Sequence, residues 1–202
     1  MRYRYLSALA LLSSVAIADP APSVNLSVGG AITPGVCNVS FGNGGALDFG
    51  AYGYHDLSET EWTTLPGKGV RLDVACGRSS TALIDITDNM ADPAQQDKTK
   101  FSLGFQDEKS VGYYDVSISN VYYDERSATL VRETAPGNWE PANYLHKDTK
   151  HGWAISPIKP PVAFSAARAT LNITPKIVPR SELDTAQPLE LAGSMSISLR
   201  YL

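Results

Sequence analysis

The thirteen residues before the C-terminal leucine carry the strongest pattern in the sequence, a strict alternation of two kinds of side chain. The odd positions are apolar or glycine: Leu189, Leu191, Gly193, Met195, Ile197, Leu199 and Tyr201. The even positions are small or polar: Glu190, Ala192, Ser194, Ser196, Ser198 and Arg200. Successive side chains of a β-strand point to opposite faces of the sheet. The pattern therefore predicts a strand with one buried face and one solvated face.

Shorter alternating stretches recur along the chain, separated by turn residues. Val70, Leu72, Val74 and Cys76 share one face of a predicted strand, and Ala46–Tyr54 has a similar pattern. Further strands are predicted around Leu83–Ile86 and over Phe101–Phe105, Tyr113–Tyr123, Ala128–Glu133, Trp153–Ile158 and Val162–Ile173, while 88–99 is predicted to be an exposed loop. We expect Ala128–Glu133 to pair with Tyr113–Tyr123. With 202 residues, 16 Gly and 13 Pro, the chain favours one all-β antiparallel sandwich or barrel.

The N-terminus has the organisation of a secretory signal. Arg2 and Arg4 precede the apolar run Leu6–Ile17, and Ala16-Ile17-Ala18 has the small-x-small pattern that signal peptidases recognise. The run is too short to span a bilayer as a stable helix. We predict a signal peptide over residues 1–18 and an exported mature domain over 19–202; an uncleaved N-terminal anchor is the alternative.

Export changes the interpretation of the two cysteines, Cys37 and Cys76. In an oxidising compartment a lone pair of cysteines forms a disulfide more often than any other structure. A metal site would need further ligands at recognisable spacing, and a reactive thiol is the remaining alternative. We predict a Cys37–Cys76 disulfide.

The charge balance and the candidate catalytic residues exclude several function classes. The chain has 17 Lys and Arg against 21 Asp and Glu, and its pI near 5.3 argues against a nucleic-acid partner. His146 and His151 are five residues apart, which would place them on opposite faces of a strand, without a third metal ligand. The sequence contains no Gly-x-Ser-x-Gly elbow. We expect no enzyme activity, no cofactor and no metal.

An acidic cluster lies at the end of the predicted strand around Leu83–Ile86 and in the loop after it. It consists of Asp85, Asp88, Asn89 and Asp92. Oxygen-rich loops bind calcium, but this spacing does not match the calcium loop of helix–loop–helix proteins. We expect a solvated turn.

The middle of the chain is rich in aromatic residues. They are Tyr113, Tyr114, Tyr122, Tyr123, Trp139, Tyr144 and Trp153. Tyr and Trp are enriched at binding surfaces, although core packing explains the same residues equally well. If the protein binds a host glycan or protein, this segment is the candidate surface.

The order of these features resembles the pilin superfamily that periplasmic chaperones and outer-membrane ushers assemble. A predicted strand leads into Cys37, a Leu-Asp-Phe-Gly step follows at 47–50, and Tyr201 is next to last in the terminal strand. More narrowly, Ile-Thr-Pro-Gly-Val-Cys at 32–37 and Gly-Gly-Ala-Leu-Asp-Phe-Gly at 44–50 resemble an uncharacterised family of fimbrial-like exported proteins of Gammaproteobacteria. The resemblance covers about residues 1–88 and 160–202.

The resemblance implies an immunoglobulin-like antiparallel sandwich that lacks its last strand, with an elaborated middle segment at about 89–159. A periplasmic pilus chaperone would lend the missing strand, and a neighbouring pilin subunit would replace it at the outer-membrane usher. The residues that would meet the donor strand or the chaperone are Met195, Ile197, Leu199, Tyr201 and Leu202. The first strand would place Leu26, Val28 and Ile32 in the core.

The implied function is a structural or adhesive fimbrial subunit, which passes through the periplasm to the fimbrium at the cell surface. Only Asp19–Asn25 would precede the first strand, and Pro20 and Pro22 lack amide donors. This tail is too short to be a donor strand, which suits a tip or minor subunit. Leu189 stands where many pilins have a glycine, so the sequence does not fix the register in which a donor strand would pair with the terminal strand. The alternative is a self-complete secreted or periplasmic sandwich that binds a glycan or small ligand.

Overall fold

The alternating segments form two antiparallel sheets in the structure, a computed structural model that describes residues 37–157 and 159–202. These residues belong to one unit, Pro34–Leu202. The predicted signal peptide lies outside the described residues, as do Leu26, Val28 and Ile32 of the predicted first strand.

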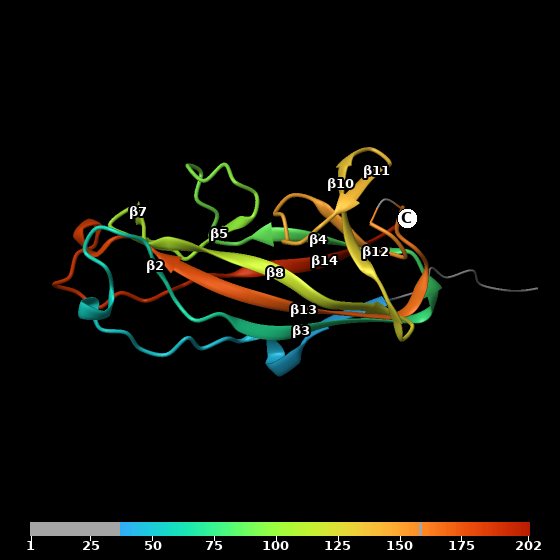
Figure 1. The fold of residues 1–202 in the computed structure, drawn as a ribbon, viewed down its shortest axis with the longest axis horizontal. Helices are drawn as coiled ribbons and strands as arrows, with labels where there is room; N and C mark the ends of the chain where they lie inside the picture. The colour runs from blue at the N-terminus through green and yellow to red at the C-terminus, as the bar shows by residue number, and fades with distance from the viewer. Residues whose placement is uncertain (1–36, 158) are drawn as a thin grey trace, which may run out of the picture. The chain divides into compact units, whose positions relative to one another are not determined.

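The larger sheet, here called sheet I, has the order β1–β3–β13–β8–β5, with β2 beside β13 and β9 beside β8. Its strands are β1 (Cys37–Phe41), β2 (Thr63–Thr64), β3 (Lys68–Ser80), β5 (Lys100–Ser102), β8 (Gly112–Tyr123), β9 (Arg126–Ser127) and β13 (Phe164–Ile177). Figure 1 shows the long strands β3, β13 and β8 lying side by side. β13 pairs with β3 along one edge and with β8 along the other.

The second sheet, sheet II, has the order β11–β10–β12–β4–β14. Its strands are β4 (Ala82–Asp88), β10 (Thr129–Ala135), β11 (Asn138–Pro141), β12 (Lys150–Ala154) and β14 (Met195–Tyr201). The remaining elements are the hairpin of β6 (Phe105–Gln106) and β7 (Lys109–Ser110) and the short 3-10 helices η1 (Gly42–Gly45), η2 (Tyr54–Asp56) and η3 (Arg180–Glu182). The predicted all-β antiparallel sandwich is confirmed.

The core lies between the two sheets and comes from the alternating positions of the sequence. On β3 the buried residues are Val70, Leu72 and Val74, while their neighbours Arg71 and Ala75 are exposed. The largest fully buried side chains include Trp153, Phe101, Phe164, Leu72, Ile84, Ile86 and Leu171. The burial of one face of each strand explains why the sequence alternates.

Several predicted strands differ from the structure in their bounds. β12 covers Lys150–Ala154, so the strand predicted over Trp153–Ile158 is wrong beyond Ala154. In Ala46–Tyr54 the residues before η2 form no strand, because Asn43, Gly44 and Gly45 take positive φ and turn the chain away from β1. The terminal strand begins at Met195 rather than at Leu189. The preceding segment is tied to the fold by single backbone bonds, such as Ala192 N–H to the carbonyl oxygen of Leu103 at 2.9 Å.

The predicted pairing of Ala128–Glu133 with Tyr113–Tyr123 is wrong. Asp124 and Glu125 both take positive φ and form a tight turn, after which only β9 pairs with β8. The chain then crosses to sheet II, where β10 pairs with β11 and β12.

Candidate functional site, an apolar groove between two sheet edges

β1 and β14 lie at the edges of the two sheets. In the described part of the chain, β1 pairs only with β3, and β14 pairs only with β4. The two edges come together where Tyr201 contacts Cys37. An unpaired strand edge presents free backbone N–H and C=O groups, which favour pairing with another strand.

The apolar face of β14 is only half covered. Ile197 and Leu199 lie directly opposite Ile86 and Ile84 of β4, so all four side chains share one face of sheet II. Ile86 and Ile84 are fully buried, whereas Ile197, Leu199 and the preceding Met195 remain partly exposed. Among the described residues, no further strand of sheet II covers the outer side of β14.

A second apolar rim faces β14. It consists of Val39 and Phe41 on β1, and of Leu47 and Phe49 in the extended segment that follows η1; all four are partly buried against the core. The ammonium of Lys68 lies 5.6 Å from the centre of the Phe49 ring and helps to hold this segment in place. Half-buried apolar side chains thus line both sides of the same gap.

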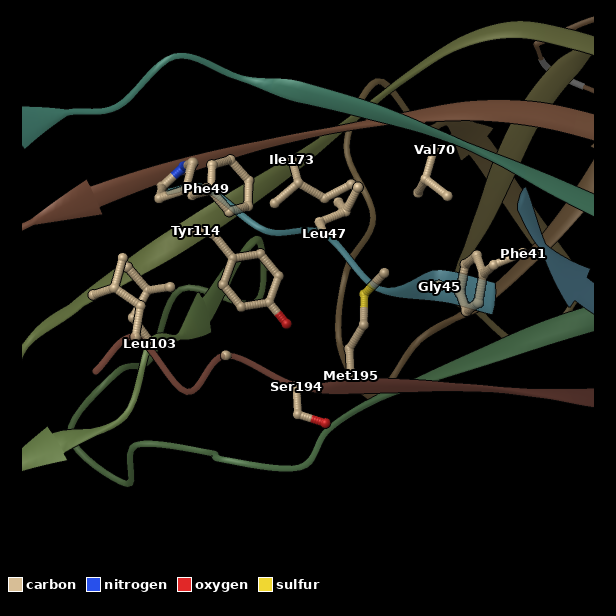
Figure 2. Close-up of a pocket in the computed structure, with 13 residues that line it drawn as sticks. Phe41, Gly45, Leu47, Phe49, Val70, Leu103, Tyr114, Ile173, Ser194 and Met195 are labelled. Carbon is tan, nitrogen blue, oxygen red and sulfur yellow. The ribbon is translucent and has the colours of Figure 1, made fainter. Parts of the chain in front are cut away.

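One cavity lies between these rims, and a second adjoins it beside the 47–54 segment. The first has a volume of about 220 Å³ and is lined by Phe41, Val70, Ile173 and Met195, among others. The second, of about 510 Å³, shares Leu47, Phe49 and Leu191 with the first. Figure 2 shows Met195 reaching across the first cavity towards Leu47. We call the two cavities and their rims the edge groove.

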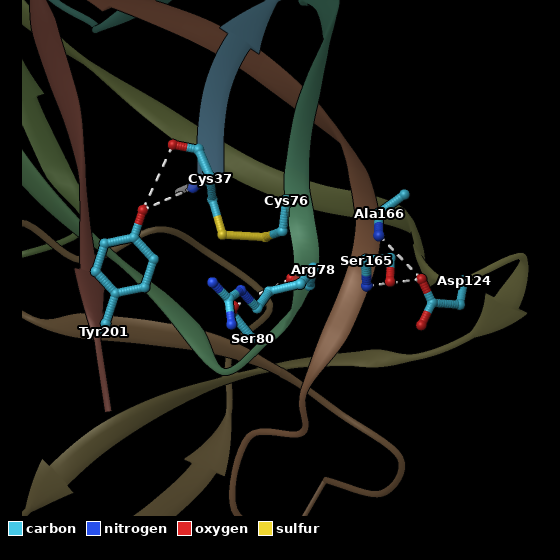
Figure 3. The surroundings of a disulfide bond; sticks show 8 residues. All are labelled: Cys37, Cys76, Arg78, Ser80, Asp124, Ser165, Ala166 and Tyr201. Atoms are coloured by element: carbon cyan, nitrogen blue, oxygen red, sulfur yellow. Dashed lines mark hydrogen bonds between the residues drawn. A yellow bond between two sulfur atoms is a disulfide. The ribbon is translucent and has the colours of Figure 1, made fainter. Parts of the chain in front are cut away.

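Tyr201 joins the two strands whose edges border the groove. The Cys37 backbone N–H donates a hydrogen bond to the Tyr201 hydroxyl oxygen at 2.8 Å, which joins β1 to β14 (Figure 3). The predicted disulfide is confirmed: Cys37 is bonded to Cys76, opposite it in the β1–β3 ladder. The disulfide fixes β1 to sheet I at the point where the two edges meet.

The side chains that line the first cavity are mostly apolar and are poorly suited to acid–base chemistry. Tyr114 is the one ionisable residue among the described residues that line it. Burial raises the pKa of Tyr114, and the nearby charge of Asp88 raises it further, so the phenol stays neutral.

The structure brings together most of the residues predicted to meet a donor strand. Met195 lines the first cavity, Ile197 and Leu199 follow it on the same half-buried face of β14, and Tyr201 contacts Cys37 of β1. Leu202 is separate: it is 73% exposed, and its N–H donates to the carbonyl oxygen of Thr81 at 3.2 Å.

The aromatic residues of the middle segment do not form one surface. Tyr114, Tyr123 and Trp153 are buried, so the prediction of a ligand surface is wrong for these three. Their burial follows from strand alternation and core packing. The other four are at least partly exposed and are spread over three segments: Tyr113 and Tyr122 on β8, Trp139 on β11, and Tyr144 in the loop before β12.

His146 and His151 lie beside each other, not on opposite faces of one strand as predicted. His146 precedes β12, and its backbone N–H donates to Nε2 of His151 at 3.2 Å. His151 Nδ1 lies 3.0 Å from the carbonyl oxygen of Thr149. Burial lowers the pKa of His151 to about 3, so the ring is neutral with both nitrogens engaged by backbone.

The acidic cluster is divided by the fold, and the prediction of a solvated turn is wrong for Asp88. Asp88 is buried; its Oδ2 accepts the Ser102 N–H at 3.0 Å and lies 3.6 Å from Nζ of Lys147. Asp85 instead pairs with Arg200 at 2.7 Å. Within 37–157 and 159–202, no group of three or more His, Cys, Asp or Glu residues could hold a metal ion. No helix in these ranges is long and apolar enough to cross a bilayer.

Sequence reasoning missed the rim opposite β14. Val39 and Phe41 alternate with polar residues after Cys37, which is the signal that identifies their shared face. The sequence predicts Leu47 and Phe49 to lie in a strand. The turn at Asn43–Gly45 instead places both side chains in the lining of the first cavity.

The fold and this site define an all-β, disulfide-bonded sandwich with a groove between two strand edges that are unpaired within 37–157 and 159–202. A protein-family model described as a protein of unknown function (DUF1120) matches residues 26–123, a segment that contains both cysteines and the β1 rim but not β14. No curated protein matches the sequence.

Proposed function

We propose that this protein is an exported fimbrial subunit that accepts a β-strand in the edge groove. A periplasmic pilus chaperone supplies the strand first, and a neighbouring subunit replaces it during assembly through an outer-membrane usher. The observation that carries this proposal is the half-buried apolar face of β14, set opposite the β1 rim across a groove.

The physical basis is β-augmentation. The incoming strand would form backbone hydrogen bonds with an open sheet edge, and its alternate side chains would fill the apolar cavities. The same pairing would remove the exposed edges and the apolar surface that favour aggregation of the free subunit. In this interpretation the sandwich is immunoglobulin-like and lacks its last strand.

The proposal is tested by expressing the protein in a periplasm with and without a tagged pilus chaperone. We expect a one-to-one complex that co-purifies with the chaperone, and aggregation or proteolysis of the subunit in its absence. A soluble subunit that unfolds cooperatively without any chaperone, and forms no complex, would instead support the self-complete binding module.

A pair of neighbouring substitutions separates groove contacts from general effects on the strand. Ile197→Thr places a hydroxyl in the groove but keeps a β-branched side chain, whereas Ser198→Thr makes a similar change on the exposed face. We expect chaperone-bound yield to fall about fivefold for Ile197→Thr and to stay unchanged for Ser198→Thr. Near-ultraviolet circular dichroism verifies that both variants fold.

A third variant fills the groove instead of making it polar. Met195→Trp adds apolar volume beside the 220 Å³ cavity. We expect it to raise the soluble yield of the subunit expressed without a chaperone and to reduce complex formation, because the side chain takes the place of the donor's. Normal complex formation by a stabilised Met195→Trp variant would contradict the proposed occupant.

A further inference from the structure

We propose that a separate cavity on the outer face of sheet I binds a neutral saccharide. The cavity has a volume of about 470 Å³, within the range of about 300–1,000 Å³ typical of small-ligand sites. Trp62, Phe105 and Tyr113 supply its aromatic surface. The proposal rests on these described side chains and does not depend on strand exchange.

Two large aromatic side chains of this surface are exposed to solvent and not packed in the core of the sandwich. Trp62 is 50% exposed and Phe105 is 42% exposed. The rings of Trp62 and Tyr113 are 5.2 Å apart and inclined by 52°, which makes an angled platform. The ring of a sugar has an apolar C–H face that packs on such aromatic faces.

Carboxylates and amides surround this platform. Asp92, Gln95, Glu108 and Glu182 line the same cavity. Among the described residues, the carboxylates of Glu108 and Glu182 have no hydrogen bond or ion pair, so both are free to accept sugar hydroxyl groups. An aromatic face with acceptors at its rim complements the two kinds of surface that a saccharide presents.

The walls of the cavity are fixed by contacts outside it. The side chain of Gln106 in the β6–β7 hairpin exchanges two hydrogen bonds with the backbone of Asp184, at 2.8 and 3.0 Å. Arg180 of η3 donates through Nε to Glu59 at 2.8 Å, which links η3 to the segment carrying Trp62. A pre-organised site loses less conformational entropy when its ligand binds.

The charges select a neutral ligand. Three carboxylates and one ammonium, that of Lys109, line the cavity, which disfavours an anionic sugar. A cationic ligand is disfavoured at Tyr113 because the ammonium groups of Lys100 and Lys176 already lie 4.6 and 5.5 Å from the centre of its ring. A neutral hexose or N-acetylhexosamine satisfies both conditions.

The saccharide cavity and the edge groove are separate sites. Tyr113 lines the cavity, while the next residue on β8, Tyr114, lines the groove from the opposite face of sheet I. The two sites share no lining residue. The cavity can therefore be tested in the free subunit or in its complex with a chaperone, and failure of either proposal leaves the other intact.

The test is saturation-transfer difference NMR with the purified protein and five probes. The neutral probes are methyl α-mannoside, lactose, N-acetylglucosamine and N,N′-diacetylchitobiose, and sialyllactose is the anionic probe. We expect a signal from at least one neutral probe and weaker binding of sialyllactose than of lactose. Trp62→Ala should weaken binding at least about tenfold. Trp139→Ala on β11 is the matched control and should leave binding unchanged.

Three results would overturn the inference. They are no signal from any neutral probe, binding that survives Trp62→Ala, or a stronger signal from sialyllactose than from lactose. Because loss of Trp62 could also disturb the neighbouring wall, Glu182→Gln provides a second variant: it keeps the shape of the cavity and removes a charged acceptor. Unchanged affinity in both Trp62→Ala and Glu182→Gln would place the saccharide elsewhere.

Discussion

The Tyr201 hydroxyl lies 2.8 Å from the backbone nitrogen of Cys37, so the last strand of sheet II is joined by one side chain to the first strand of sheet I. The hydrogen bond takes up a backbone donor at the edge of β1, next to the disulfide that fixes β1 to β3. The contact holds β1 beside β14, while Phe41 and Met195 of the same two strands line the first cavity.

Removal of this hydroxyl tests the contribution of the contact. Tyr201→Phe keeps the ring and loses the hydrogen bond, so we expect the free energy of unfolding to fall by about 1 kcal/mol. Urea unfolding measures the change. Tyr52→Phe is the control, because the Tyr52 ring is exposed and makes no hydrogen bond with the described residues. Equal stability of the two variants would show that the Tyr201 contact contributes nothing.

The disulfide should contribute more than the hydrogen bond. Cys37 and Cys76 are 39 residues apart, and in the chain-entropy model closing such a loop stabilises the fold by about 4 kcal/mol. We expect a Cys37→Ser/Cys76→Ser variant to have a much lower urea midpoint than the oxidised protein. Reduction with dithiothreitol should lower the midpoint of the wild type but not that of the variant. A midpoint insensitive to dithiothreitol in the wild type would contradict this role.

Strand alternation made much of the sandwich predictable, because each buried face leaves a period of two in the sequence. Leu72 and Val74 on β3, and Ile197 and Leu199 on β14, were assigned to their faces correctly. Alternation does not state which strand pairs with which. The assignment of Ala128–Glu133 to the wrong sheet shows this limit, because a tight turn at Asp124–Glu125 redirects the chain.

Predictions about polar and aromatic side chains failed where long-range contacts decide burial. Asp88 follows a predicted strand and resembles a loop residue, yet Lys147, 59 positions later, gives it a buried partner. The residues around Trp62 do not alternate between apolar and polar, so no pattern marks its position. Its ring forms a binding surface only together with Tyr113, which it contacts in the folded protein. Neither pair leaves a pattern that one sequence can reveal.

The buried histidine predicts loss of stability in acid. Burial holds the pKa of His151 at about 3 in the folded protein, below its usual value of 6.5. The unfolded chain therefore binds the proton first, and stability falls as the pH drops from about 6.5 towards 3. Between pH 6.5 and pH 4 this residue alone should cost about 3 kcal/mol.

Urea unfolding across this pH range tests the contribution of His151. His151→Gln cannot gain a charge, so its stability should fall less steeply with acidification than that of the wild type. His55→Gln, at an exposed position, is the matched control and should follow the wild type. A slope unchanged by His151→Gln would assign the acid sensitivity to other groups, such as Glu133, whose pKa is lowered by its hydrogen bond with Lys150.

The buried pair of Asp88 and Lys147 predicts a different kind of sensitivity. Asp88→Asn would leave the ammonium of Lys147 buried without a carboxylate, and removal of one member of a buried pair costs about 3 kcal/mol or more. The exposed pair of Arg71 and Asp73 provides the control, because Asp73→Asn should cost less than about 1 kcal/mol.

Lys147→Met separates the cost of the unpaired ammonium from the cost of the backbone hydrogen bonds that Asp88 accepts. The Asp88→Asn/Lys147→Met double variant removes both charges, so it should be more stable than Asp88→Asn alone, and urea unfolding of all four proteins in the cycle measures the coupling. Asp88 also accepts the backbone N–H groups of Met90 and Ser102, and asparagine can keep only part of this role. The double variant should therefore stay below the wild type. If Lys147→Met brings no recovery in the Asp88→Asn background, these backbone hydrogen bonds, not the ion pair, account for the stability lost in Asp88→Asn.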